Sequence, residues 1–229
     1  MQKVIFAAMI LVGVALISTA SAELVGTVDI EGHGNGLSST GQLWSPALGG
    51  ESGGNFYTGL YSWTNAGGTG LGTLVPNWGF CIELPQSPIA GWQNVLTLDE
   101  APMPAQFGTP MGIAKANAIS ELWGRHFDPA WTTGAGAGNP MAQAFGACIW
   151  EIVYETDPVW DVTSGAGFSG AIALPALANS WLAELDGTGP HAFVFATSSV
   201  DGQDYAVPEP ATIGILGLGA LALLRKRRA

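Results

Sequence analysis

Basic side chains are almost absent from the middle of this sequence. Between residues 23 and 206 there are 17 acidic residues but only two basic ones, Lys115 and Arg125. The resulting net charge of −15 repels phosphate backbones and anionic lipid headgroups, so we expect no nucleic-acid partner and no attraction to an anionic membrane surface. Strong acidity also keeps an exported protein soluble.

The residue patterns of common catalytic and metal sites are also missing. The three histidines, His33, His126 and His191, lack the spacing of metal ligands, and there is no serine elbow or phosphate-binding loop. We therefore expect no metal, no cofactor and no enzymatic activity. Two weaker alternatives exist: Glu83 and Glu151 as a glycosidase carboxylate pair, and calcium held by Asp157 and Asp161.

Long apolar runs occur only near the two ends. Residues 1–22 have the three parts of a secretory signal peptide: Lys3, then the apolar residues 4–17, then Ala20-Ser21-Ala22 as a small-residue cleavage site. We expect this segment to be removed on export, which leaves residues 23–206 as one exported domain.

The C-terminal segment, residues 207–229, also has three parts. Val207-Pro208-Glu209-Pro210 is stiff and extended because each proline fixes its own φ and restricts the preceding residue. An uncharged, mostly apolar run over residues 211–224 follows, and the basic tail Arg225, Lys226, Arg227 and Arg228 comes next. A run of 14 residues is shorter than the roughly 20 that cross a bilayer comfortably. This favours a processed sorting signal with a short transmembrane helix over an uncut tail anchor.

This segment resembles the PEP-CTERM sorting signal of Gram-negative bacteria, in which Pro208-Glu209-Pro210 is the motif. The resemblance implies recognition by an exosortase, a membrane protease-transpeptidase. It also implies transient insertion in the inner membrane, followed by transfer to the cell surface or extracellular matrix. Cell-envelope or exopolysaccharide components are the partners expected there.

Residues 23–206 combine strand and helix patterns. Alternating residues predict strands over 24–30, 56–63 and 78–84, with glycine-rich turns at 32–36 and 67–72, and a late strand over 191–197. Apolar spacing predicts helices over 113–127 and 140–155, and a third, short helix is expected over 175–185. The expected fold is α+β, with an N-terminal β-sandwich or barrel-like half and a helical half.

Three aromatic residues alternate along the second predicted strand. Tyr57, Tyr61 and Trp63 lie on one face if the strand is regular. Such a face can stack on sugar rings, as in a carbohydrate-binding module, or fill a β-sandwich core, and core packing is the preferred interpretation.

Four short motifs resemble the landmarks of bacterial thioester domains, which are surface adhesin modules. They are Phe80-Cys81-Ile82-Glu83, the helix over 115–123, the stretch from Ala144 to Ile152, and Gln203-Asp204. The resemblance implies a strand cysteine, Cys81, bonded to a helix glutamine four residues before Trp150, in a thioester that acylates a target. The glutamine position is Gly146 here, and glycine cannot form this bond.

Cys81 and Cys148 are the only cysteines, and three interpretations of them stay open. The preferred one is a Cys81–Cys148 disulfide, worth roughly 4 kcal/mol in the chain-entropy model. Positions 146 and 148 lie about 200° apart around a helix, so Cys148 does not occupy the glutamine face. The alternatives are two free thiols and a Cys81–Gln143 thioester, since Gln143 is nearly one turn before Gly146.

Overall fold

The computed structural model describes residues 24–34, 37–45, 50–102, 109–133, 139–156, 159–165 and 168–209. The signal peptide over 1–22, the apolar run over 211–224 and the basic tail lie outside these residues and stay predictions. Among the described helices, none is both long enough and apolar enough to cross a membrane.

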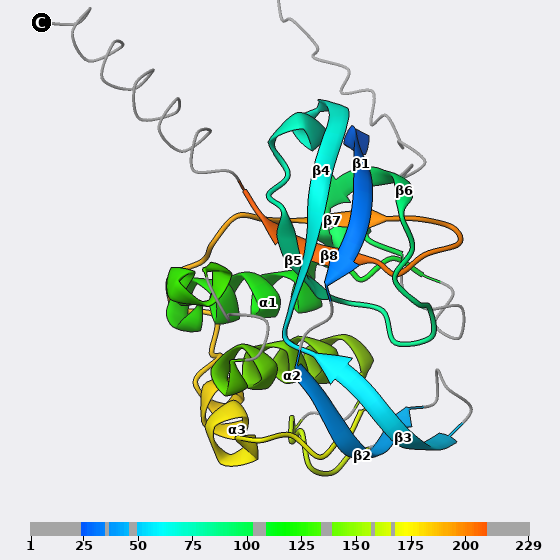
Figure 1. Ribbon diagram of the computed structural model, residues 1–229. Helices are drawn as coiled ribbons and strands as arrows, with labels where there is room; N and C mark the ends of the chain where they lie inside the picture. The colour runs from blue at the N-terminus through cyan, green and yellow to red at the C-terminus, as the bar shows by residue number, and fades with distance from the viewer. Residues whose placement is uncertain are drawn as a thin grey trace, which may run out of the picture.

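Six antiparallel strands close into a barrel (Figure 1). In spatial order these strands are β1 (Leu24–Gly34), β4 (Leu60–Gly70), β5 (Trp78–Cys81), β8 (Tyr205–Pro208), β7 (Val194–Ser198) and β6 (Gly91–Thr97), and β6 pairs back to β1. A barrel was among the expected architectures. It is not confined to the N-terminal half, however, because β7 and β8 follow the helices in the chain.

The helices are inserted between β6 and β7. They are α1 (Ile113–His126), α2 (Pro140–Tyr154) and α3 (Pro175–Ala183), close to the three predicted helices, so the fold is α+β as expected. Short 3₁₀ turns occur at Leu71–Leu74, Leu98–Glu100 and Pro129–Thr132. In Figure 1, α1 lies below the barrel and α2 lies between α1 and α3.

A separate hairpin of β2 (Leu37–Ser45) and β3 (Gly50–Thr58) extends from the barrel and packs on α2. The single strand expected over 56–63 is therefore wrong, because the chain leaves one sheet at Thr58 and enters the other at Leu60. Gly59 makes this change of direction with a φ of +110°, which favours glycine. A Cβ at Gly59 would also lie only 3.3 Å from the backbone nitrogen of Gln143 in α2.

The expected turn over 67–72 is also different. Residues 67–70 continue β4 along β1, with Gly26 opposite Gly70, and the 3₁₀ turn begins at Leu71. The backbones approach so closely that a Cβ at Gly72 would collide with the carbonyl oxygen of Thr27. Glycine is needed here because the backbone of the 3₁₀ turn packs closely on the backbone of β1.

An aromatic core joins the barrel to the helices. Phe80, on the outer side of β5, packs against Trp123 of α1 and Phe145 of α2, with ring centroids 5.4 and 4.8 Å apart. The segment of α2 from Ala142 to Tyr154 is buried throughout. The apolar residues that predict the helices over 113–127 and 140–155 are buried, except Ile113 and Met141 in the first turns, which are exposed.

Candidate functional site

A buried polar cluster lies where β5 ends and where the chain enters β8. We call it the Cys81 cluster and define it as Cys81, Glu83, Tyr154, Gln203 and Asp204. The Cys81 thiol donates to the Glu83 carbonyl oxygen at 3.0 Å, and Gln203 Nε2 donates to the same oxygen at 3.0 Å. Tyr154 of α2 accepts a hydrogen bond from the Leu84 N–H at 2.7 Å. The cluster therefore ties three distant parts of the chain together.

Burial sets the protonation of this cluster. It raises the pKa of Glu83 to about 7 and, together with the negative charge of Glu83, that of Asp204 to about 8. Burial also raises the pKa of the Cys81 thiol far above its usual range. Because the thiolate is the nucleophilic form, Cys81 is a neutral and unreactive thiol at neutral pH.

The two cysteines are free and buried, so the expected disulfide is not formed. Their surroundings explain this. The Cys81 thiol donates to the carbonyl oxygen of Glu83, just after the end of its own strand. The Cys148 thiol instead donates to the Ala178 carbonyl oxygen of α3 at 3.4 Å. The two thiols therefore serve different interfaces, one at the barrel and one between α2 and α3.

Gly146 lies where α2 touches Thr58 and Gly59, at the junction between β3 and β4. A Cβ at this position would lie 2.7 Å from the Gly59 nitrogen and 2.6 Å from Thr58 Oγ1. No glutamine side chain fits there without movement of the backbone. Gln143 uses its side-chain oxygen to accept a hydrogen bond from the Ala173 N–H at 2.8 Å, which connects α2 to the segment before α3.

The two glutamates of the glycosidase alternative belong to different clusters. Glu83 accepts a hydrogen bond from the backbone of Asp204, whereas Glu151 accepts one from the Asp161 N–H at 2.8 Å. Burial raises the pKa of Glu151 to about 8. Both carboxyl groups are buried at the junctions of chain segments.

Asp161, one half of the calcium alternative, organises a turn. Its carboxylate accepts hydrogen bonds from Thr163, Ser164 and Asn179. Burial would raise its pKa, but these hydrogen bonds outweigh that effect and lower the pKa to about 2. Asp157 lies outside the described residues, and within them no group of three metal-ligating side chains occurs.

The three candidate ligand-face aromatics do not form one exposed face. Tyr61 and Trp63 are buried inside the barrel, where they pack against Tyr205 with centroids 5.6 and 4.9 Å apart. Tyr57 lies on β3 in the other sheet and is 42% exposed. The break at Gly59 separates residues that a regular strand would have aligned, and core packing explains Tyr61 and Trp63.

The sequence patterns did not indicate a groove around Trp92, which we call the Trp92 groove. It measures about 260 Å³ and lies between β6 and the β7–β8 loop. Trp92 is 62% exposed, and polar residues flank it: Thr27, Asn94, Ser199 and Asp201. The sequence analysis did not single out Trp92, because the strand over 91–97 was not predicted.

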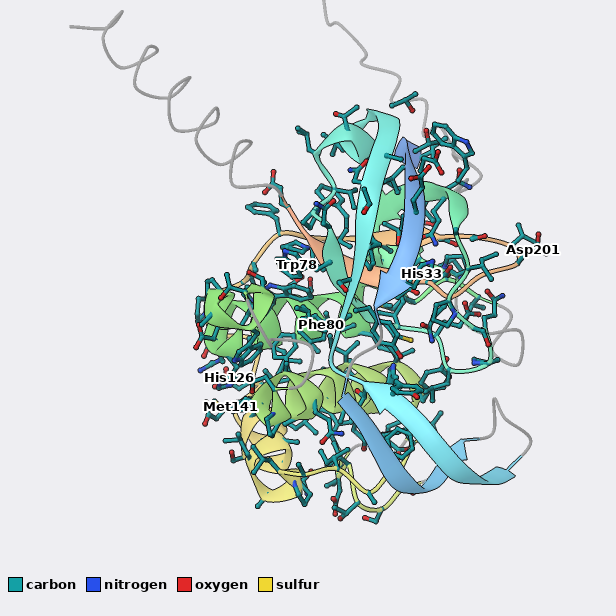
Figure 2. All side chains as sticks on the ribbon, in the orientation of Figure 1. His33, Trp78, Phe80, His126, Met141 and Asp201 are labelled. Atoms are coloured by element: carbon teal, nitrogen blue, oxygen red, sulfur yellow. The ribbon has the colours of Figure 1, made fainter. Side chains whose placement is uncertain are left out.

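A second groove, which we call the rim groove, lies at the end of β8. It measures about 440 Å³ and is lined mainly by apolar side chains, among them Leu74, Trp78, Trp123, Phe127, Phe193 and Pro208. Trp78 and Phe127, which both line it, stack with ring centroids 5.2 Å apart. Figure 2 shows Trp78 between the barrel and the helices.

The sorting motif begins inside the barrel wall. Val207 is buried and pairs with Phe195, Pro208 is opposite Val194, and the Glu209 N–H donates to the Phe193 carbonyl oxygen at 2.8 Å. Residues 207–209 of the expected sorting segment are therefore paired with the barrel. Pro210 and the basic tail lie outside the described residues.

A family model of the PEP-CTERM protein-sorting motif matches residues 206–228. This match supports an exported protein that is processed by an exosortase and reaches the cell surface or the extracellular space. No curated protein and no solved structure shows detectable similarity to the chain.

Proposed function

We propose that this protein is a structural or adhesive component of the cell surface or extracellular matrix. The match of residues 206–228 to the sorting motif carries the proposal. According to this proposal, the apolar run over 211–224 inserts transiently in the inner membrane. An exosortase then cuts the chain near the motif. The folded domain passes to the envelope or to its exopolysaccharide.

The charged side chains inside the domain hold its helices and loops together, and this supports a structural role for the domain. Buried Glu121 accepts hydrogen bonds from Arg125 and from the Gly187 and Gly189 N–H groups, which fastens α1 to the segment before β7. Lys115 donates to the Val153 and Glu155 carbonyl oxygens at the end of α2. We accordingly propose that the domain has no enzymatic activity and that Glu83 and Glu151 serve the fold.

Processing is tested in a host with and without its exosortase. Changing Glu209 and Pro210 to alanine alters the motif beyond the last strand residue, so the barrel is left intact. We expect the variant, and the wild type in the host without exosortase, to accumulate uncut in the membrane fraction. Normal cutting and release in both cases would exclude exosortase processing.

Binding of a neutral polysaccharide is a second candidate function, and the Trp92 groove is the observation that favours it. A half-exposed indole ring offers an apolar face to a sugar ring, and the neighbouring amide and hydroxyl groups can exchange hydrogen bonds with sugar hydroxyls. This assigns the carbohydrate-binding alternative to Trp92 instead of to Tyr61 and Trp63.

The comparison of Trp92→Ala with Tyr57→Ala tests this second function. Both positions are exposed strand aromatics, but only Trp92 lines the groove. We expect Trp92→Ala to lose retention on a gel containing the host exopolysaccharide while Tyr57→Ala keeps it. Equal retention of both variants and the wild type would remove sugar binding at this groove from consideration.

A further inference from the structure

The place where the chain leaves the barrel restricts how the domain can sit on a membrane. β8 ends at Pro208, and the next residue, Glu209, is still hydrogen-bonded to Phe193. The apolar run begins at Ala211, so only two residues separate it from the barrel wall. Even fully extended, this connection spans about 10 Å.

The surface around this exit is apolar. Phe193 is 76% exposed and lies next to the exit, and Leu74, which also lines the rim groove, is 37% exposed. Ile113, which is 68% exposed, lines a neighbouring pocket together with Phe193. Glu209 is the only charged residue among the described residues that line the rim groove.

We propose that this end of the barrel, the exit face formed by Leu74, Ile113 and Phe193, rests in the lipid interface while the chain is still attached to the membrane. The inference rests on the proposed insertion of residues 211–224. A connection of two residues cannot hold the domain away from the bilayer. It therefore brings the exit face, which is exposed and apolar, close to the lipid. Exposed patches of this kind mark contact surfaces.

The expected lipid is a neutral, zwitterionic one. The net charge of −15 over residues 23–206 opposes contact with anionic headgroups, so attraction by charge does not contribute. Contact instead depends on apolar side chains and on the attached segment, which makes the interaction insensitive to salt. After cutting, the attachment is lost and the exit face alone has to hold the domain. We therefore expect release from the bilayer to follow processing.

Site-specific fluorescence tests the contact. Because Cys81 and Cys148 are buried, a single cysteine introduced by Phe193→Cys can be labelled selectively with a polarity-sensitive dye. Val200→Cys is the matched control, since Val200 is 91% exposed in the loop that joins β7 to β8 at the other end of β8. Figure 2 shows the adjacent Asp201 far from Trp78.

The labelled chain from residue 23 to residue 229 is reconstituted into phosphatidylcholine vesicles, with flotation as the measure of insertion. We expect a blue-shifted emission at position 193 that spin-labelled phosphatidylcholine quenches several-fold more strongly than at position 200. Both labels should emit as in water when the chain ends at Pro210.

Three results would overturn the proposal. If the chain floats with the vesicles but both labels emit as in water, the segment inserts and the exit face does not touch lipid; the proposed sorting route then stands alone. A blue shift at position 193 without quenching by lipid indicates a second copy of the chain on this face. If the chain does not float, membrane insertion and the lipid contact both fail.

Discussion

At the scale of single residues, Gly146 is the position where sequence and structure explain one another most directly. Glycine inside a helix costs roughly 1 kcal/mol relative to alanine, so its presence in α2 needs a reason. The reason is the backbone of Gly59, 2.7 Å from where a Cβ would lie. The same contact closes the position at which the thioester resemblance places a glutamine.

Gly146→Ala is expected to destabilise the domain by about 1–3 kcal/mol, because overpacking against backbone atoms outweighs the gain in helix propensity. Urea unfolding followed by far-UV circular dichroism measures the change. A domain that becomes more stable by the roughly 1 kcal/mol of helix propensity alone would show that α2 and the backbone of Gly59 do not approach this closely.

Three buried carboxyl groups predict an unusual dependence of stability on pH. The folded-state pKa values of Glu83, Glu151 and Asp204 are about 7, 8 and 8, whereas unfolded carboxyl groups titrate near pH 4. The folded state thus binds these protons more tightly. The stability that they contribute is fully present below the unfolded pKa and is lost as pH rises through 7 and 8.

We therefore expect the melting temperature to fall as pH rises from 5 to 8, measured by scanning calorimetry. Asp204→Asn keeps an oxygen to accept the Ser199 N–H and should flatten this slope. Asp201→Asn, at an exposed position three residues earlier, should leave the slope unchanged. A melting temperature that is constant or rises over this range would contradict the buried, protonated state of these groups.

The number of labels that a thiol-blocking reagent adds to the protein, read from the intact mass, tests whether both cysteines are free and buried. Because both thiols are inaccessible and un-ionised, we expect no label under native conditions and two labels after unfolding without reductant. A Cys81–Cys148 disulfide would instead give no label after unfolding. A thioester would give one label and a mass lower by one ammonia.

At the scale of elements, α2 shows how the domain places its few cations. The Lys115 ammonium reaches from α1 to the carbonyl oxygens of Val153 and Glu155, where the partial negative charge of the helix terminus is greatest. At its other end, Asn139 accepts a hydrogen bond from the Met141 N–H and Pro140 occupies the first turn. Both ends of the central helix are thereby satisfied.

Lys115→Met keeps the apolar stem but removes the charge, and we expect it to cost about 1.5–3 kcal/mol, the range for hydrogen bonds to charged groups. Asn117→Ala, at an exposed position on the same helix, is the control and should change stability little. Equal stabilities of the two variants in guanidinium unfolding would mean that Lys115 does not hold α2.

The elements also show what the sequence could reveal. The three helices were predictable because α1 and α2 have long apolar stripes, and because α2 and α3 each have a proline in the first turn. The break in the chain at Gly59 was not, since it depends on contact with α2 from 84 residues further along. Neither β6 nor β8 was predicted, because short strands are fixed by their barrel neighbours more than by their own pattern.

The candidate sites also divide into those with a contiguous sequence pattern, which could be predicted, and those that depend on distant contacts, which could not. The sorting motif was found from sequence because its three parts are contiguous. Tyr61 and Trp63 were correctly given core packing as the preferred interpretation, but their separation from Tyr57 needed the structure. The partnership of Glu83 with Asp204 joins residues 121 positions apart, and no local pattern reports it.

At the scale of the whole molecule, the barrel and the sorting signal share residues. β8 lies between β5 and β7, so the last residues before the apolar run over 211–224 complete the barrel wall. The fold therefore limits where the chain can be cut without damage. A cut before Val207 would remove a buried side chain and the partners of Phe195 and Val194 in β7.

Two truncated chains test this limit, one ending at Ala206 and one ending at Pro210. Loss of the buried Val207 side chain alone costs about 1.5–3 kcal/mol, and loss of the strand pairing adds to this. We expect the chain ending at Ala206 to be less stable by at least that amount in urea unfolding, and the chain ending at Pro210 to match the uncut protein. Equal stabilities would show that β8 needs no residue of the motif.

The same reasoning predicts the C-terminus of the processed protein. Because the residues of β8 and Glu209 are paired in the barrel, a protease cannot cut before Glu209 in the folded domain without opening this pairing. We expect mass spectrometry of the released protein to find a C-terminal residue at Glu209 or beyond. A C-terminus at Ala206 or Val207 would mean that the end of β8 leaves the barrel before cutting. The released domain would then lack residues of β8 that pair with β7.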